Sequence, residues 1–315
     1  MISSAVNFGF SFSGRQCSVN VYLNDPTAHN YLQYELDGVY QKRTRIEGNE
    51  KQELVITATT NGTHTVWIYK ATEAHTGPVF IERVSGQNVQ PIKRPELPLI
   101  EFIGNSITCG AAADASETPC GTGVYHDQHN AYYAYGPRAA RALHANFVLS
   151  SVSGFGIYRT WNTESPNLPQ VYEKTDFQPS GQRYWNFNIY SPRIVSIALG
   201  TNDLSDGDGM HARNPFDSSV FVDRYIKFVH LVKSKYPSAV IALLSSPMVN
   251  GEKRIILQHC LTAVKENIDR EYPDEKVSLY FFKPMEPRGC GYHPSVEDHA
   301  ILAEELVPFL KNLLH

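Results

Sequence analysis

A proline-rich segment at residues 91–98 divides the chain into two parts with different hydrophobic patterns. It has the sequence PIKRPELP, with three prolines in eight residues. Such a segment cannot form a helix or a central strand, because proline lacks the backbone N–H and its ring clashes with the preceding helical turn. We therefore predict two domains, residues 1–95 and residues 96–315.

The N-terminal part has the pattern of an all-β domain. Runs typical of strands are residues 17–23, 31–36, 53–60, 64–70 and 79–84. Turn residues separate these runs, and spacings of about ten residues are typical of a β-sandwich or jelly roll. Asn61-Gly62 predicts a hairpin, because two-residue hairpin turns favour this dipeptide. With Thr63 it also forms a glycosylation sequon, which is the alternative interpretation.

The C-terminal part alternates between strand and helix patterns. Short apolar runs typical of buried parallel strands are residues 99–103, 147–152, 194–199, 240–244 and 277–282. Patterns with helical spacing are residues 129–143, 221–232, 254–268 and 296–314. This alternation predicts a three-layer α/β/α domain, in which helices cover both faces of a parallel sheet.

Charge and hydropathy exclude several classes of protein. Lys and Arg total 28 against 32 Asp and Glu, which gives a net charge of -4. Without a block of like charges, we expect no nucleic-acid partner and no binding to an anionic membrane. The apolar runs are far shorter than the roughly 20 residues that cross a bilayer.

The cysteines and histidines give no metal signature. The five cysteines are widely spaced and include no C-x-x-C pair, and the sequence leaves open whether Cys109 pairs with Cys120. His126, Asp127 and His129 lie together but lack the spacing of a zinc site, so we predict no metal.

Polar residues follow the predicted strands at the sheet edge where open α/β domains bind ligands. Ser106, in GNSITCG, follows the first strand and is placed as a nucleophile on a tight turn. The surrounding residues do not form the G-x-S-x-G elbow, and a helix N-cap is the alternative role for this serine. His293, in GCGYHP, precedes Pro294 and is a candidate general base outside a helix.

Two further strand ends could supply hydrogen-bond donors. Gly154, in SGFG, allows the backbone to approach a ligand and to point an N–H at it, although an ordinary turn would have the same sequence. Asn202, in GTND, has a side-chain amide that could donate to an oxyanion, and an Asx-turn is its alternative role.

In this order, these Ser, Gly, Asn and His motifs resemble those of the SGNH (GDSL-type) hydrolases. The resemblance implies that Ser106 is the nucleophile, Gly154 and Asn202 form the oxyanion hole, and His293 is the base. Asn105 departs from the family pattern, which usually has Asp before the nucleophile.

With the N-terminal part included, the chain resembles carbohydrate esterase family 2. The matching segments include NGTHTV at residues 61–66, KATEA at 70–74 and SGFGIYR at 153–159. This resemblance implies a jelly roll before an SGNH domain, and acetyl xylan esterase activity on acetylated xylan or glucomannan without a metal or organic cofactor. It also implies a secreted or periplasmic protein, although the N-terminal residues MISS are not a signal peptide.

Most SGNH enzymes have an aspartate three residues before the histidine, where this chain has Cys290. We therefore predict a Ser–His dyad, in which a backbone carbonyl such as that of Cys290 accepts the Nδ1 proton of His293. Family 2 esterases that work without the acidic residue support this interpretation. A carboxylate of Asp203, Glu286 or Asp298 beside His293 would contradict it.

Aromatic side chains are candidates for binding the faces of sugar rings: Tyr292, Trp161 and Trp185. The alternative for the two tryptophans is that they pack their loop onto the domain. Two other functions remain open, namely another SGNH acylhydrolase (sialate O-acetylesterase, lipase or thioesterase) and a non-catalytic carbohydrate-binding protein.

Overall fold

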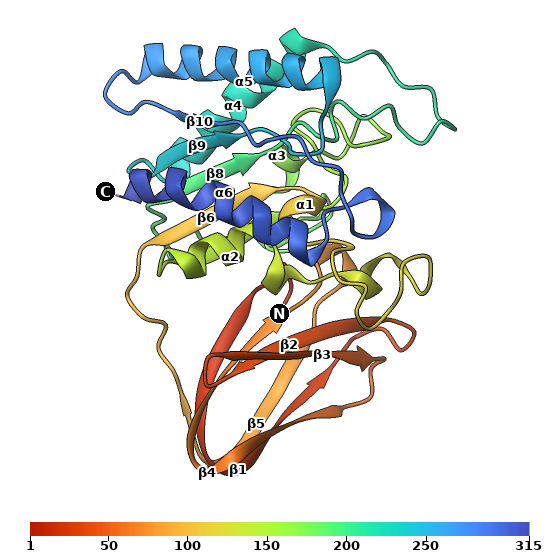
Figure 1. Cartoon of the computed structure of the whole chain (residues 1–315), viewed down its shortest axis with the longest axis vertical. Helices are drawn as coiled ribbons and strands as arrows, with labels where there is room; N and C mark the ends of the chain where they lie inside the picture. Colours follow the sequence, from red (N-terminus) through yellow and green to blue (C-terminus); the bar gives the residue numbers. More distant parts are fainter. Residues whose placement is uncertain (315) are drawn as a thin grey trace.

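The computed structural model describes residues 1–314 and contains two five-stranded sheets (Figure 1). We refer to residues 1–95 as the N-terminal domain and to the rest as the C-terminal domain. The N-terminal sheet is antiparallel, with strand order β3-β2-β4-β1-β5. Its strands are β1 (Asn7–Tyr22), β2 (His29–Leu36), β3 (Val39–Glu47), β4 (Gln52–Lys70) and β5 (Phe80–Pro91).

The hairpin prediction at Asn61-Gly62 is wrong, because β4 is a single strand that continues through these residues. Neither residue has the positive φ that a type I′ turn requires. Strand β4 instead bulges where it pairs with β1: Gly14 lies opposite Gly62, whereas Gln16 lies opposite Thr57. The extra residues of β4 occupy the bend that the sequence pattern suggested was a turn.

Both halves of the bent strands contribute to one hydrophobic core, over which the sheet closes as a sandwich. Phe10 and Phe12 come from the first half of β1, and Val19 and Val21 from the second. Strand β3 lies at the edge of the sheet and was not predicted. Its charged residues (VYQKRTRIE) protect an edge strand from further pairing, but they hide the alternation by which strands are recognised.

The second sheet is parallel, as predicted, with strand order β10-β9-β8-β6-β7. Its strands are β6 (Leu99–Gly104), β7 (Asn146–Ser151), β8 (Ile194–Ala198), β9 (Val240–Leu244) and β10 (Ser278–Tyr280). The strand order reverses at β6, where the chain adds β7 on one side and β8 on the other. Ligands bind at such a reversal, beyond the carboxyl ends of the strands.

Helices cover both faces of this sheet. Figure 1 shows α4 and α5 on one face and α2 and α6 on the face toward the N-terminal domain, and each pair packs in its own hydrophobic cluster. The helices are α1 (Ser106–Cys109), α2 (Tyr135–Ala142), α3 (Leu168–Val171), α4 (Ser218–Lys235), α5 (Gly251–Glu271) and α6 (Val296–Leu314). Short 3₁₀ turns are η1 (Ala74–Thr76), η2 (Tyr125–Gln128), η3 (Ala131–Tyr133) and η4 (Cys290–Tyr292). In the described part of the chain, residues 1–314, the helices are too short or too polar to span a membrane.

The two domains share an extensive polar interface. Buried Arg43 of the N-terminal domain donates to the carbonyl oxygens of Asp127 and His129, both at 2.8 Å. The backbone N–H of Ala131 donates to the carbonyl of Ala71 at 3.0 Å. The segment between β6 and α2 therefore rests on the N-terminal sheet, which fixes one wall of the site described next.

Candidate active site

One pocket at the carboxyl ends of the parallel strands brings together the four predicted catalytic groups. Ser106 follows β6, Gly154 follows β7, Asn202 follows β8, and His293 comes from the loop before α6. All four line the same pocket, together with side chains of the N-terminal domain. Residues spaced over most of the C-terminal domain thus meet at the point where the strand order reverses.

Ser106 is the first residue of helix α1 and does not cap it. The cap is Asn105, whose side-chain oxygen accepts the backbone N–H of Ile107 at 3.1 Å. Gly110 ends this single turn with a φ of 67°, a left-handed conformation that suits glycine. The N-cap alternative for Ser106 is therefore wrong, and its hydroxyl is available to the pocket.

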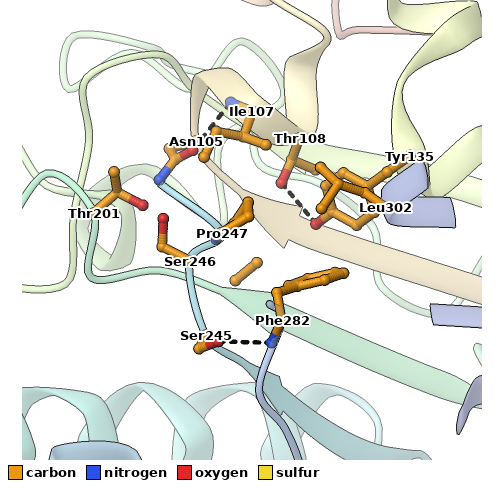
Figure 2. Close-up of a pocket in the computed structure, with 11 residues that line it drawn as sticks. Asn105, Ile107, Thr108, Tyr135, Thr201, Ser245, Ser246, Pro247, Phe282 and Leu302 are labelled. Atoms are coloured by element: carbon orange, nitrogen blue, oxygen red, sulfur yellow. Dashed lines mark hydrogen bonds between the residues drawn. The ribbon is translucent and has the colours of Figure 1, made fainter. Parts of the chain in front are cut away.

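A small cavity of about 10 Å³ adjoins this turn. Its lining includes Asn105, Thr108 and Thr201 (Figure 2). The hydroxyls of Thr108 and Tyr135 lie 3.0 Å apart and tie α1 to α2. The Asn105 Nδ2 group is buried and has no hydrogen-bond partner among residues 1–314. The turn that carries Ser106 is therefore held against α2, and the Asn105 Nδ2 group beside it remains an unused hydrogen-bond donor among residues 1–314.

The two predicted oxyanion donors lie in adjacent turns that are bonded to each other. Gly154 has a φ of 79°, and a Cβ atom there would lie 2.9 Å from the Trp161 ring. Asn202 Nδ2 donates one hydrogen to the carbonyl of Phe155 at 2.8 Å. This bond fixes the orientation of the amide and leaves its second hydrogen free for a ligand.

Asp203 supports the oxyanion turn and does not contact His293. Its fully buried carboxylate accepts the backbone N–H groups of Ile157 and Tyr158, each at 3.0 Å. Burial raises the pKa of Asp203 to about 6, although these N–H groups partly offset that effect. We conclude that this acidic residue holds the chain that follows Gly154 in place.

The His293 imidazole is oriented by a backbone carbonyl, as the dyad hypothesis requires. The carbonyl in hydrogen-bond contact with Nδ1 is that of Gly291, and the suggested carbonyl of Cys290 offsets the lowering of the His293 pKa by burial less than Gly291 does. His293 Nδ1 lies 2.9 Å from the carbonyl oxygen of Gly291, whereas the carbonyl of Cys290 accepts the His293 backbone N–H at 3.1 Å. A proton on Nδ1 leaves Nε2 free to act as a base. Among the described residues, none of the three alternative carboxylates (Asp203, Glu286, Asp298) hydrogen-bonds to His293.

A disulfide bond holds the loop that carries the base. Cys120 and Cys290 are bonded across a sequence separation of 170 residues, whereas Cys109 is a buried free thiol. The sequence had left open a pair between Cys109 and Cys120, and that pair does not form. The disulfide bond joins the loop that carries His293 to the segment that leads from Cys120 to Tyr125 at the start of η2.

The Tyr125 hydroxyl occupies the space between the nucleophile and the base. It donates to Ser153 Oγ at 3.3 Å and lies 3.4 Å from His293 Nε2. The Ser106 side chain lies close enough to the same hydroxyl to lower the pKa of Tyr125 slightly, although burial outweighs this effect and raises it. Ser106 Oγ and His293 Nε2 make no direct hydrogen bond to each other in residues 1–314, and catalytic hydrogen bonds often form only when substrate binds.

Burial lowers the pKa of His293 below its usual value, and the hydrogen bond to the Gly291 carbonyl only partly offsets this. The imidazole is therefore neutral at pH 7 and can accept a proton. This is the protonation state that a general base needs.

Two of the three predicted aromatic residues line the pocket. Trp161 is half exposed, and the Tyr292 side chain stands in solvent with an exposed fraction of 86%. Trp185 lies elsewhere, where its ring stacks on that of Tyr190 with centroids 5.8 Å apart, and it lies close enough to Tyr236 to offset part of the rise that burial causes in the pKa of that residue. Trp185 therefore packs the loop after β7 onto the domain, which was the alternative for this residue.

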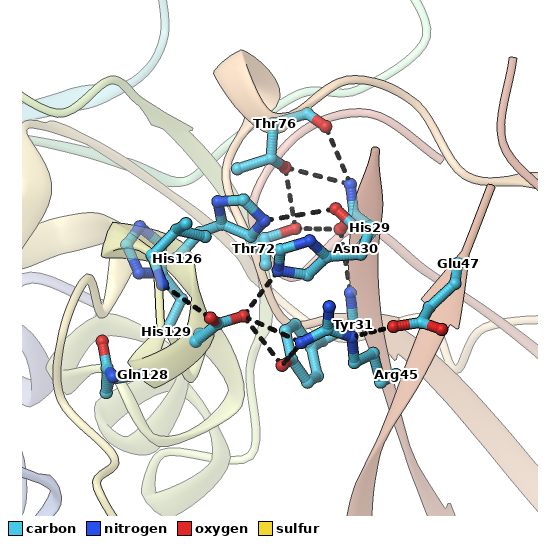
Figure 3. Close-up of polar contacts among 12 residues, drawn as sticks. His29, Asn30, Tyr31, Arg45, Glu47, Thr72, Thr76, His126, Gln128 and His129 are labelled. Atoms are coloured by element: carbon cyan, nitrogen blue, oxygen red, sulfur yellow. Dashed lines mark hydrogen bonds and ion pairs between the residues drawn. The ribbon is translucent and has the colours of Figure 1, made fainter. Parts of the chain in front are cut away.

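A cluster of His29, His126 and Asp127 at the domain interface has potential metal ligands within 4.8 Å of one another (Figure 3). Its carboxylate is already engaged, because Asp127 Oδ1 accepts the Tyr31 hydroxyl at 2.8 Å and pairs with Arg45 at 3.7 Å. We therefore interpret this cluster as an ion-paired contact between the domains.

Sequence reasoning missed a buried carboxylate at the site. Glu73 of the N-terminal domain lines the pocket and is only 3% exposed. It belongs to the KATEA segment that contributed to the family resemblance, but no role was assigned to it. No local signal in the sequence marks it, because the turn around it also contains Thr72, His75 and Thr76.

Comparisons with known proteins agree with this architecture. The carbohydrate esterase 2 N-terminal family model matches residues 1–95. The GDSL-like lipase/acylhydrolase family model matches residues 102–280, more than half of the chain.

Two acetylxylan esterase/glucomannan deacetylases of Cellvibrio japonicus are 28% and 30% identical to the chain. These alignments cover 81% and 79% of the chain, and 68% and 69% of those proteins. The structure of a family two carbohydrate esterase from Clostridium thermocellum, in complex with cellohexaose, is also similar. It has a TM-score of 0.86 and 27% identity, covering 99% of this chain and 94% of that one. The chain therefore belongs to the GDSL-like lipase/acylhydrolase family and, within it, to carbohydrate esterase family 2.

Proposed function

We propose that this protein is a carbohydrate O-acetylesterase, which removes acetyl groups from plant polysaccharides through an acetyl-enzyme on Ser106. The observation that carries the proposal is the convergence of Ser106, Gly154, Asn202 and His293 on one pocket. A nucleophile, an oriented base and two oxyanion donors are the groups that acyl transfer needs.

In the first half of the reaction, His293 Nε2 takes the proton of Ser106 as its Oγ attacks the acetyl carbonyl carbon. The Gly291 carbonyl holds the imidazole in the required tautomer throughout. The Tyr125 hydroxyl, which lies 3.4 Å from Nε2, must move aside for this transfer to occur. The protonated imidazole then donates its Nε2 proton to the departing sugar oxygen.

Negative charge on the carbonyl oxygen would be held by the N–H of Gly154 and the free N–H of the Asn202 amide. One such donor is typically worth about 3 kcal/mol in the transition state. In the second half of the reaction, water attacks the acetyl-enzyme with His293 as its base, and acetate leaves from Ser106.

The walls of the pocket favour a carbohydrate substrate. Both domains contribute polar residues to its lining, among them Asn24, Asp25, Thr27, Ser205 and Asn250. The aromatic faces of Trp161 and Tyr292 suit the apolar faces of sugar rings. The names of the two bacterial relatives support xylan and glucomannan as the acetylated polymers. Because a polymer cannot enter a cell, we place the protein outside the cytoplasm, secreted or periplasmic.

We expect acetate release from acetylated xylan or acetylated glucomannan, and faster hydrolysis of an acetyl ester than of an octanoyl ester of the same alcohol. The cleft is open to solvent, so a long acyl chain bound in it would remain in contact with water. Acetate assays on the two polymers and initial rates with the two esters measure this. A preference for the octanoyl ester, with no release from either polymer, would favour a lipase or thioesterase. Oligosaccharide binding without turnover of any ester would favour a carbohydrate-binding protein.

A further inference from the structure

A buried carboxylate of the N-terminal domain lies against the oxyanion turn of the C-terminal domain. Glu73 lies between β4 and η1. Its Oε2 atom accepts the backbone N–H of Ser153 at 2.7 Å, directly before Gly154. Its Oε1 atom accepts from His129 Nε2 at 3.3 Å. One side chain thus reaches across the interface and uses both of its oxygens there.

The surroundings of Glu73 also define the direction of these hydrogen bonds. The backbone N–H of Ala112 donates to His129 Nδ1 at 3.2 Å, so the ring carries its proton on Nε2, which faces Glu73. Burial would raise the pKa of Glu73, but hydrogen bonds from His129 and Ser153 outweigh burial and lower it to about 2. Glu73 is therefore a buried anion at every pH at which an esterase is assayed.

We propose that Glu73 is a positioning residue for the esterase reaction: its carboxylate fixes the Ser153 N–H, so that the next N–H, of Gly154, is aimed at the oxyanion, and its charge favours protonated His293. The role rests on the proposed function, because it acts on the oxyanion donor and the base of that reaction. Glu73 in this way provides from the N-terminal domain the negative charge that the dyad lacks.

The electrostatic part of the proposal depends on what surrounds His293. The titratable groups that face it come from three other segments: Glu73, Tyr125, His129 and His299. Burial keeps two of them uncharged, because it raises the pKa of Tyr125 and lowers that of His299 to about 3. The Asp298–Arg288 pair that flanks this loop is already neutralised by its own contact. The Tyr125 ring packs between His129, which bonds to Glu73, and His293, with ring centroids 4.7 Å and 5.9 Å away. Glu73 is therefore the nearby anion among these groups, and it favours the charged imidazole.

We expect the Glu73→Gln variant to lower kcat for an acetyl ester by about 10- to 100-fold with little change in KM. A carboxamide has one oxygen, so it cannot accept from both Ser153 and His129, and one donor is left facing its N–H₂ group. Activity needs neutral His293, and loss of the Glu73 charge lowers the pKa of that group. In the wild type, the decrease of kcat/KM on the acidic side of the pH profile follows the His293 pKa, which already lies below the usual histidine value. In Glu73→Gln this acidic limb must therefore move to lower pH.

The Glu73→Asp variant separates position from charge. The aspartate side chain keeps the negative charge but is one methylene shorter, so its carboxylate lies farther from the Ser153 N–H. We expect kcat to fall while the acidic limb stays in place. Glu35→Gln is the matched control, because Glu35 also accepts a hydrogen bond across the interface, from Tyr132, but does not line the pocket. We expect it to keep both kcat and the pH profile of the wild type.

Wild-type kcat in Glu73→Asp, or in folded Glu73→Gln, would overturn the positioning role. A lowered kcat with an unshifted acidic limb in Glu73→Gln would overturn the electrostatic role. If Glu73→Gln does not fold, Glu73→Asp decides the positioning role. Failure of the wild type to hydrolyse any acetyl ester would instead refute the proposed function, so the two failures are distinguishable.

Discussion

We expect the His293→Ala variant to hydrolyse acetyl esters about 10⁴- to 10⁶-fold more slowly than the wild type, because members of a nucleophile–base unit fail together. Without the imidazole, no other group in the described site is placed to take the Ser106 proton. The Tyr125 hydroxyl contacts both residues, but burial raises its pKa and makes it a poor base at neutral pH. Initial rates of acetate release at neutral pH measure the loss.

Two controls make the His293 result specific. Imidazole added to the solution should restore part of the activity of His293→Ala, because the substitution leaves a cavity that opens to the pocket. His230→Ala removes a surface histidine of α4 that pairs with Glu271 at 2.7 Å, and it should keep wild-type activity. A His293→Ala rate within tenfold of the wild type would show that another group is the base.

We expect Asn202→Ala to lower kcat by about 10²- to 10³-fold, the usual loss for an oxyanion donor. The amide lies in the pocket with one hydrogen bonded to the Phe155 carbonyl and the other free. Its loss should affect the transition state more than the bound ester, so KM should change little. Steady-state kinetics with a small acetyl ester separate the two constants.

A second variant removes both N–H groups while keeping the volume of the side chain, and both variants need a check of folding because Asn202 also holds the turn at Phe155. Asn202→Asp keeps the size of the side chain but has no N–H to donate, and its charge would repel an oxyanion. We expect a loss at least as large as that of Asn202→Ala. A wild-type kcat in either variant would remove Asn202 from the oxyanion hole.

The parallel sheet and the four groups at its edge could be predicted because both depend on local sequence. Short apolar runs locate buried strands, and the residues that follow them must emerge at the carboxyl edge. Ser106 and Asn202 each lie within a few residues of a strand that was predicted correctly. Their place in the pocket follows from the topology alone.

What could not be predicted depends on contacts between distant segments. Glu73 reaches the Ser153 turn across 80 residues, and Cys120 bonds to Cys290 across 170. No local pattern encodes such partners. The error at Asn61-Gly62 was of another kind, because the dipeptide permits a turn while the long pairing of β4 with β1 keeps the strand continuous.

The most direct test of the account is acetate release from acetylated xylan, with wild-type protein measured beside folded Ser106→Ala at equal concentration. We predict sustained release by the wild type and none above background by the variant, because Ser106 Oγ is the atom that takes the acetyl group. Equal release by the two proteins would contradict the assignment of Ser106 and the acetyl-enzyme mechanism.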